Sequence, residues 1–337
     1  TSDGEYVTLT GTIPKSGTWS MQDTADNAMP LVIAQQLKNK GYSAYAYHNH
    51  SYTYYHREQS HPNLGYDFTA VGNGLEITNQ WPESDLEMID VTTENYMTQQ
   101  PFHVYYLTVS GHMEYEFNED INAMACKNQE LVKDLPYSEA VKAYLACQIE
   151  LDRALELLLQ RLEEAGLAEN TVIALTADHY PYGLTLQQLN ELAGHEVDTR
   201  FEIYRNACII YKKGMTPETV DTLCSSLDYL PTLCNLFGVD YDSRLYMGTD
   251  AFSDAERLVM LSDRSWLTEN GSYYTLTADY TPFDENEISQ DLIAYYNSVV
   301  ANKFLASQWV LETDYWRYLF PEEPEEEPTE VLPAETE

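Results

Sequence analysis

Residues 171–179 read TVIALTADH, and this stretch decides the fold class. Residues 171–176 form a continuous run of apolar and β-branched side chains, which is typical of a strand that is buried on both faces of a sheet. The run stops at a polar pair, Asp178 and His179. A buried strand that delivers polar side chains at its carboxyl end is typical of a parallel α/β sheet, where ligands bind beyond the strand ends.

Two more stretches of the chain have the same character. Residues 42–47 (YSAYAY) predict a strand that stops at His48, and residues 102–109 (FHVYYLTV) predict one that is followed by His112. Helical patterns alternate with them: residues 30–38 precede Gly41, and a long apolar periodicity runs between Ser138 and Gly166. We therefore expect an α/β fold with a mostly parallel central sheet flanked by helices.

Polar side chains follow each of the three predicted strands. His48, His112 and the pair Asp178-His179 all stand at predicted carboxyl ends. Because the carboxyl ends of parallel strands lie on one edge of a sheet, these side chains are expected to converge on one site.

The C-terminal part of the chain has a different pattern. Residues 257–262 and 272–277 predict a hairpin turned at Asn270-Gly271, and residues 288–304 predict a helix. We expect one α/β domain over residues 1–250 and a small subdomain of antiparallel strands and a helix over residues 251–319, packed on it. Residues 320–337 carry eight Glu and no Lys or Arg, which predicts a disordered acidic Pro/Glu tail.

The charge balance excludes several classes of partner. The 337 residues contain 18 Lys and Arg against 55 Asp and Glu, a formal net charge of −37. Without clustered basic residues the chain is not expected to bind nucleic acid or an anionic membrane surface. No apolar run approaches the ~20 residues of a membrane helix.

Thr1 and Asp178-His179 are the first candidates for chemistry. A threonine hydroxyl attacks well only when a metal or a base assists the loss of its proton. Asp178 and His179 offer a carboxylate oxygen and an imidazole nitrogen to a divalent metal. The same dipeptide is also expected where an Asp caps a turn beside a surface His that binds nothing. If Thr1 is the natural N-terminus, its own amine could be the base, but this leaves the strand-end motifs unexplained.

Residues 48–57 (HNHSYTYYHR) place three His, three Tyr and one Arg in ten positions. The guanidinium of Arg57 matches phosphate oxygens, and histidines can hydrogen-bond them. A polar surface loop, or a zinc site of His48, His50, His56 and His61, would contain the same residue types. The 28 Tyr residues of the chain are compatible with an aromatic-lined sugar or lipid-headgroup surface, and equally with ordinary packing.

Taken in order, the motifs resemble the lipoteichoic acid synthase family, extracellular phosphoglycerol transferases of the sulfatase and alkaline phosphatase superfamily. They are TSDGEY at residue 1, the block GYSAYAYHNHSYTYYHREQSHPNLGYD at 41–67, LTVSGH at 107–112, TADHYPYG at 176–183, SSLDYLPTLCNLFGVD at 225–240 and MGTDAF at 247–252. The resemblance runs from Thr1 to about Tyr274. It implies a sulfatase-like catalytic fold and metal-dependent transfer of glycerophosphate from phosphatidylglycerol to a polymer or glycan acceptor in cell-envelope polymer synthesis.

The resemblance also implies roles for single residues. Thr1 matches the nucleophile that forms a glycerophosphoryl intermediate, and Thr1, Asp178 and His179 match ligands of a divalent ion, most often Mn²⁺ and otherwise Mg²⁺. Arg57 and His112 match residues that hold the phosphoglycerol head group, and His112 could also transfer a proton.

His48 matches the histidine that begins the same binding loop. Tyr55 stands where the synthases carry Trp, which keeps an aromatic wall.

The resemblance further implies parts that precede Thr1. They are a first sheet strand with one more metal ligand, a Glu, and membrane helices that anchor the enzyme on the outer face of the cell membrane. Without that Glu, weak metal binding and little turnover are expected. Two other functions are compatible with the same candidate site residues. One is a phosphodiesterase or sulfatase-type hydrolase, and the other is a non-catalytic module that binds wall polymer. The short Cys or Ser motif of classical sulfatases is not found, which disfavours sulfatase chemistry.

Overall fold

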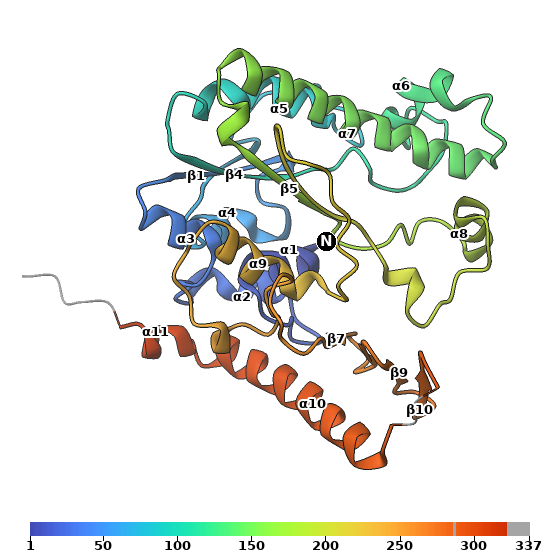
Figure 1. Ribbon diagram of the computed structural model, residues 1–337. Coiled ribbons are helices and arrows are strands. Elements are labelled where there is room, and N and C mark those ends of the chain that lie inside the picture. The colour runs from blue at the N-terminus through green and yellow to red at the C-terminus, as the bar shows by residue number, and fades with distance from the viewer. Residues whose placement is uncertain (286–287, 322–337) are drawn as a thin grey trace, which may run out of the picture.

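A computed structural model describes residues 1–285 and 288–321 of the protein (Figure 1). The predicted acidic tail lies outside the described residues from residue 322 onward. Within the described part, none of the helices combines the length and apolar character that crossing a membrane requires.

The centre of the fold is a parallel sheet of four strands in the order β3-β2-β1-β4, which confirms the predicted α/β class. The strands are β1 (Ser43–Ser51), β2 (Asp67–Val71), β3 (Gly74–Leu75) and β4 (Phe102–Leu107). The expectation that the first strand stops at His48 is wrong. β1 continues to Ser51, and His48 pairs with Ala70 on one side and Leu107 on the other.

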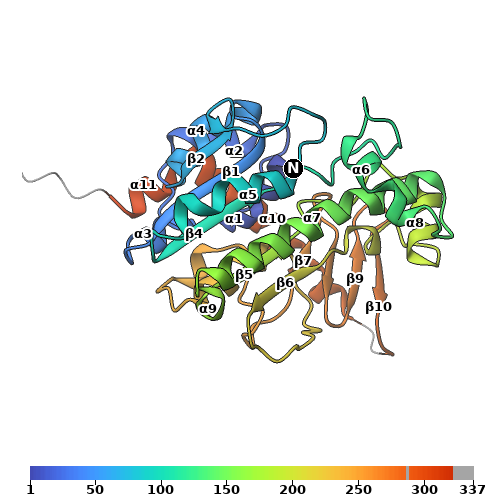
Figure 2. The same ribbon diagram turned by 90° about the horizontal axis from the view of Figure 1, so that it is seen from above.

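Helices cover both faces of this sheet, α5 and α7 on one side and α1 to α4 on the other (Figure 1). They are α1 (Ser2–Thr10), α2 (Ser20–Asp23), α3 (Ile33–Lys38), α4 (Arg57–Asn63), α5 (Asp85–Tyr96), α6 (Ala123–Val132), α7 (Glu139–Glu164), α8 (Leu186–Ala193) and α9 (Tyr229–Leu236). Seen from above, α5 lies over β1 and β4 and α7 over β5 (Figure 2). α3 is shorter than expected, because the chain is helical only from Ile33 onward.

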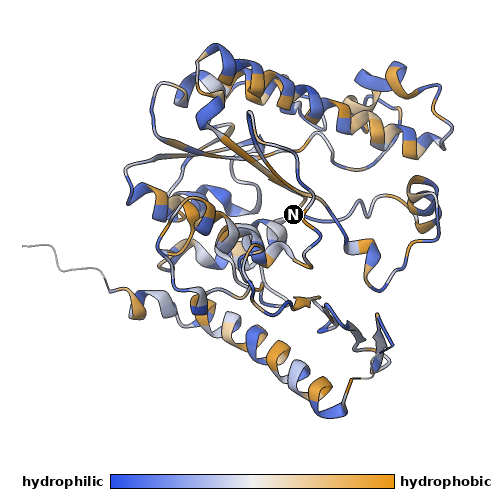
Figure 3. Ribbon diagram, viewed as in Figure 1, coloured by the Kyte–Doolittle hydropathy of each residue, from blue (hydrophilic) through white to orange (hydrophobic). Residues whose placement is uncertain are grey.

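Apolar side chains explain why these helices cover these faces. The buried residues of α7, among them Ala154, Leu158 and Leu162, recur at helical spacing and contact α5 and the sheet. In Figure 3, hydrophilic (blue) and hydrophobic (orange) residues are interleaved along α7, as expected of a helix with one buried side. On the other face, Tyr6 and Leu9 of α1 pack against Ala44 and Ala46 of β1 in one cluster.

The strand that was expected to join the parallel sheet pairs elsewhere. β5 (Val172–Thr176) forms an antiparallel pair with β6 (Cys208–Lys212), separate from the parallel sheet. Ile173 of β5 shares an apolar cluster with Phe102 and Tyr106 of β4 under α7. This shared cover keeps β5 beside the sheet, so its carboxyl end still reaches the common edge.

The C-terminal region forms a second, antiparallel sheet in the order β10-β9-β8-β7, as predicted. Its elements are β7 (Val259–Met260), β8 (Trp266–Thr268), β9 (Gly271–Tyr274), β10 (Asp279–Pro282), α10 (Gln290–Glu312) and α11 (Tyr315–Leu319). Asn270 lies in the hairpin turn, but the strand before the turn is β8 and not residues 257–262. Leu311 and Trp316 attach this region to the cluster around α1.

Candidate active site

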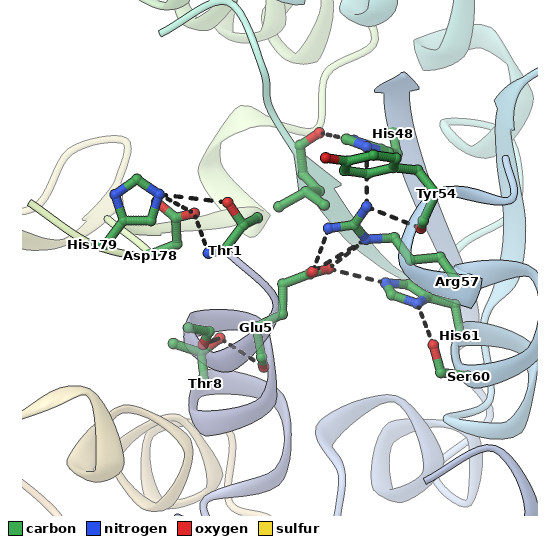
Figure 4. Close-up of polar contacts among 12 residues, drawn as sticks. Thr1, Glu5, Thr8, His48, Tyr54, Arg57, Ser60, His61, Asp178 and His179 are labelled. Carbon is green, nitrogen blue, oxygen red and sulfur yellow. Dashed lines mark hydrogen bonds and ion pairs between the residues drawn. The ribbon is translucent and has the colours of Figure 1, made fainter. Parts of the chain in front are cut away.

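Three predicted site residues, Thr1, Asp178 and His179, meet at the carboxyl ends of the strands (Figure 4). Thr1 Oγ1 lies 3.5 Å from His179 Nε2, and Thr1 N lies 3.7 Å from Asp178 Oδ2. His179 Nε2 is also 3.2 Å from Asp178 Oδ2. The hydroxyl of Thr1 thus lies beside the carboxylate of Asp178 and the imidazole of His179, although Thr1 and His179 are 178 positions apart in the sequence.

A glycine in the first turn of α1 permits this meeting. A Cβ atom at Gly4 would lie 2.5 Å from the carbonyl oxygen of Asp178 and 2.8 Å from its Cα. Any larger residue would push α1 away from the end of β5. Thr1 is the N-cap of α1, so the close approach of Gly4 places the Thr1 hydroxyl beside Asp178 and His179.

The donor set suits a divalent cation. Asp178 gives hard oxygen, His179 gives an imidazole nitrogen, and the Thr1 hydroxyl adds a third donor within 3.5 Å of that nitrogen. His179 Nδ1 lies 2.9 Å from the carbonyl oxygen of Tyr180, which fixes the ring and leaves Nε2 on the Thr1 side. Among the described residues no three His, Cys, Asp or Glu side chains gather at one point, so these residues supply part of a coordination shell.

Arg57 lies in a second cluster, and it is bound to α1, the helix that Thr1 precedes as N-cap. Arg57 Nη2 is 2.6 Å from Glu5 Oε2, and Nε is 3.2 and 3.1 Å from the two Glu5 oxygens. Burial alone would raise the pKa of Glu5, but the Arg57 guanidinium and His61 together lower it to about 2. Glu5 is therefore a carboxylate at every physiological pH, and Figure 4 shows it reaching from α1 toward Arg57.

His48 orients Arg57 from the other side. Its Nδ1 lies 3.0 Å from Leu107 O, and its Nε2 lies 3.4 Å from Arg57 Nη1. Burial, and then the charge of Arg57, lower the pKa of His48 to about 3. The ring is neutral, so Nδ1 donates to the carbonyl and Nε2 accepts from Arg57. Both nitrogens are occupied, and His48 is 4% exposed.

Tyr55 and Tyr54 cover the guanidinium of Arg57. The guanidinium carbon is 5.2 Å from the Tyr55 ring centre and 5.9 Å from that of Tyr54. Tyr55 and His56 both have φ of 55°, the left-handed region that non-glycine residues rarely adopt. These two strained residues lie where the tyrosine rings cover the guanidinium of Arg57. That Tyr55 forms an aromatic wall beside a substrate stays a prediction.

His112 lies apart from both clusters, in the loop after β4. Its Nδ1 is 2.6 Å from Met113 O, and its ring packs on Trp81 with the ring centres 4.8 Å apart. The loops after β4 and β5 touch, since a Cβ atom at Gly183 would lie 2.8 Å from Met113 Cβ. The structure thus brings His112 to the same edge as His179 without a direct contact between them.

Sequence reasoning missed two acidic residues that hold these loops. Glu5 is one helical turn after Thr1, and Asp85 is buried at the start of α5. Asp85 Oδ1 accepts from Val109 N at 2.9 Å and Asn49 Nδ2 at 2.8 Å, and Oδ2 accepts from the Ser110 hydroxyl. No local pattern marks either residue, because their partners are distant in sequence.

The four-histidine zinc site is wrong: among the described residues no group of three such ligands forms, and His50, His56 and His61 each face a different glutamate.

Comparison with known proteins agrees with this fold. A family model described as Sulfatase matches residues 1–239. The lipoteichoic acid synthase-like protein YvgJ of Bacillus subtilis is 23% identical over 331 residues, which cover 94% of this chain and 52% of YvgJ. The chain thus spans about half the length of this relative.

Two solved structures share the architecture. The lipoteichoic acid synthase LtaP from Listeria monocytogenes superposes with a TM-score of 0.76 at 22% identity, over 92% of this chain and 80% of LtaP. The Streptococcus pyogenes phosphoglycerol transferase GacH, in complex with sn-glycerol-1-phosphate, gives 0.54 at 15% identity, over 93% and 75%. These likenesses confirm the α/β fold, and because the family model matches more than half of the residues, the chain belongs to the sulfatase family.

Proposed function

We propose that the protein is a metal-dependent phosphoglycerol transferase that uses Thr1 as its nucleophile. The observation that carries the proposal is the position of the Thr1 hydroxyl, which lies 3.5 Å from His179 Nε2 in the loop that follows β5. The lipoteichoic acid synthase-like YvgJ and LtaP, and the glycerol-phosphate complex of GacH, support glycerophosphate as the transferred group.

The first half-reaction joins the head group to the enzyme. Thr1 Oγ1 attacks the phosphorus of phosphatidylglycerol, the bond from phosphorus to the diacylglycerol oxygen breaks, and that oxygen leaves with a proton. A divalent ion, Mn²⁺ or else Mg²⁺, held by Thr1, Asp178 and His179, would lower the cost of removing the Thr1 proton and neutralise phosphate charge. The remaining steps use the chain's own side chains.

Arg57 is proposed to bind the phosphoglycerol head group. Glu5 and His48 occupy part of its guanidinium, which fixes the direction of the N–H groups that remain. In this arrangement His48 acts on the substrate through Arg57, and Tyr55 forms the wall beside it. His112 would protonate the leaving oxygen or orient the acceptor, since imidazole is the commonest proton-transfer group in enzymes.

The second half-reaction releases the group to an acceptor. The acceptor hydroxyl attacks the same phosphorus, the bond to Thr1 Oγ1 breaks, and the acceptor proton returns to Thr1. We propose a glycerophosphate polymer or a glycolipid as acceptor, and the outer face of the cell membrane as the location. Anchoring would come from helices upstream of Thr1.

The test is intact-mass spectrometry of the chain, expressed with any residues that precede Thr1 in its natural gene. It is incubated with Mn²⁺ and phosphatidylglycerol beside its Thr1→Ala variant. We expect a glycerophosphate adduct and diacylglycerol release only with Thr1 present. Diacylglycerol release by both proteins would contradict Thr1 as nucleophile, and adduct-free release of glycerophosphate to water would indicate a hydrolase. If neither the adduct nor released diacylglycerol is found, the result would favour a module that only binds wall polymer.

A further inference from the structure

His50 lies on the path of ring contacts that joins Arg57 to His112. Its ring centre is 5.0 Å from that of Tyr54, which covers the guanidinium of Arg57. It is also 5.2 Å from the ring centre of Trp81, and Trp81 lies 4.8 Å from the ring centre of His112. These contacts place His50 next to both residues that are proposed to meet the substrate.

A buried carboxylate fixes the ring of His50. Its Nδ1 is 2.8 Å from Oε1 of Glu83, a residue that is 7% exposed. The segment of Glu83 is itself held in place, because its carbonyl oxygen accepts from Asn49 Nδ2 at 3.3 Å and the hydroxyl of Ser84 donates to Glu150. With Nδ1–H donating to Glu83, the basic nitrogen of His50 is Nε2, which accepts no hydrogen bond from the described residues.

The charges around His50 suit an imidazole that exchanges a proton. Oε2 of Glu83 is buried without a hydrogen-bond partner in the described part of the chain. His48, whose ring centre is 6.0 Å away, is neutral, and the charge of Arg57 is paired with Glu5 at 2.6 Å. The Glu83 carboxylate therefore compensates the positive charge that the ring acquires when Nε2 takes up a proton.

The other histidines of the site lack this arrangement. Both ring nitrogens of His48 are occupied, and His179 is proposed as a metal ligand. Nδ1 of His112 is 2.6 Å from the carbonyl oxygen of Met113, which is an uncharged partner. Of these rings, only that of His50 combines a carboxylate on Nδ1 with an open Nε2.

The proposed double displacement needs a proton-transfer group on one side of the phosphorus. In each half-reaction the attacking and leaving oxygens lie in line. The diacylglycerol oxygen therefore leaves from the side opposite Thr1, and the acceptor oxygen attacks from that same side. A group that protonates the first of these oxygens stands where it can deprotonate the second.

We infer that His50 is this proton-transfer group and that Glu83 is its positioning residue. Nε2, protonated through solvent by the proton that Thr1 gives up, donates that proton to the diacylglycerol oxygen as the bond from this oxygen to phosphorus breaks. The ring is then neutral. In the second half-reaction Nε2 takes the proton of the acceptor hydroxyl as the new oxygen–phosphorus bond forms and the bond to Thr1 Oγ1 breaks, and exchange with solvent returns this proton to Thr1. The inference rests on the proposed function and leaves His112 to orient the acceptor.

The experiment varies the leaving group, because an oxygen that leaves as a stable anion needs no acid. Phosphatidylglycerol and the p-nitrophenyl ester of glycerophosphate are given, with glycerol as acceptor, to the parent and to His50→Gln, both expressed as for the adduct test. In His50→Gln we expect diacylglycerol release to fall about 10²–10⁴-fold and p-nitrophenol release in the first turnover to fall no more than about tenfold. Intact-mass spectrometry should then show the Thr1 adduct accumulating in the variant and not in the parent, since no group deprotonates the acceptor.

Three further variants separate this role from a structural one. Glu83→Gln should show the same difference between the two esters, but a smaller one, because an amide does not compensate the charged ring. Arg57→Lys should slow both esters alike, because both carry the same phosphoglycerol. His56→Asn is the matched control: its ring also faces a carboxylate, Glu58 at 3.3 Å, but it is 45% exposed and has no proposed role. This change should leave both rates unchanged.

Two results would overturn the inference. Equal losses with the two esters in His50→Gln would make His50 a structural residue. The difference between the esters appearing in His112→Gln instead would assign the proton transfer to His112. A parent that forms no Thr1 adduct with either ester would remove the proposed function and the inference with it, whereas an adduct in the parent without the leaving-group effect in His50→Gln would remove the inference alone.

Discussion

The guanidinium of Arg57 and the carboxylate of Glu5 form a buried ion pair in which each side chain is 1% exposed. Glu5 lies one turn after Thr1 on α1, and Arg57 begins α4. The pair therefore ties the helix of the proposed nucleophile to the loop of the proposed head-group site. A movement of either one is resisted by the cost of separating two buried charges.

Replacing Glu5 by Gln should destabilise the protein by about 3–5 kcal/mol, because Arg57 would then be a buried charge without its counter-ion. Urea unfolding of the variant and the parent measures this difference. Glu130→Gln is the matched control: Glu130 Oε2 is 2.6 Å from Lys133 Nζ, but both side chains are more than half exposed. That change should cost no more than about 1 kcal/mol. Equal effects of the two changes would refute the strong Glu5–Arg57 coupling.

Replacing Gly4 by Ala should destabilise the chain, although alanine is the better helix former by about 1 kcal/mol. The added methyl would collide with the Asp178 backbone at 2.5 Å, and we expect a loss of about 1–3 kcal/mol. Thermal and urea unfolding measure it. In the adduct assay the variant should also react more slowly, since α1 must move away from Asp178. A gain in stability would show that Gly4 and Asp178 are not in contact.

Asp85→Ala should loosen two loops at once, because its carboxylate holds Asn49 of β1 and the Val109-Ser110 turn after β4. Four donors would lose their buried acceptor, so a loss of about 2–4 kcal/mol is expected. Hydrogen exchange should accelerate at residues 109–112. Asp90→Ala, on the same helix, removes a 54% exposed partner of Arg161 and serves as the control. Unchanged exchange at residues 109–112 in the Asp85 variant would contradict the positioning role.

Stability should fall as the pH is lowered from about 6.5, partly because of His48. Its pKa is about 3 in the folded chain, against 6.5 for an ordinary histidine, so the unfolded chain binds the extra proton between these values. Between pH 7 and pH 5 this one group should contribute about 2 kcal/mol of lost stability. Unfolding at both pH values in the parent and in His48→Gln measures the contribution.

His195→Gln is the control for that experiment. The exposed ring of His195 pairs with Glu202 at 2.6 Å, and this hydrogen bond raises its pKa. A raised pKa favours the folded chain at low pH, the opposite sign to His48. The acid-induced loss should therefore shrink in His48→Gln and not in His195→Gln. An identical loss in the parent and in His48→Gln would mean that the buried ring is protonated.

Elements that depend on local pattern could be predicted from the sequence. The apolar runs before His112 and Asp178 do form strands, and the long periodicity between Ser138 and Gly166 is α7. The predicted end of the first strand, at His48, was wrong, because polar residues after an apolar run indicate a loop as readily as a continued strand. His48 and Asn49 are nevertheless buried. Leu107 and Arg57 contact the two ring nitrogens of His48, and Glu83 and Asp85 accept from Asn49 Nδ2.

The sequence alone determined the α/β class, the C-terminal antiparallel sheet and the residue types that the site would use, since these follow from periodicity, charge and motifs. Only the tertiary structure decided that β5 pairs with β6 and that Glu5 neutralises Arg57. It also decided that Trp81, which lies far from both histidines in the sequence, packs between the rings of His50 and His112. The physical reason is that strand pairing, buried ion pairs and ring contacts join residues that are distant in sequence, and no local propensity encodes which partner each residue meets.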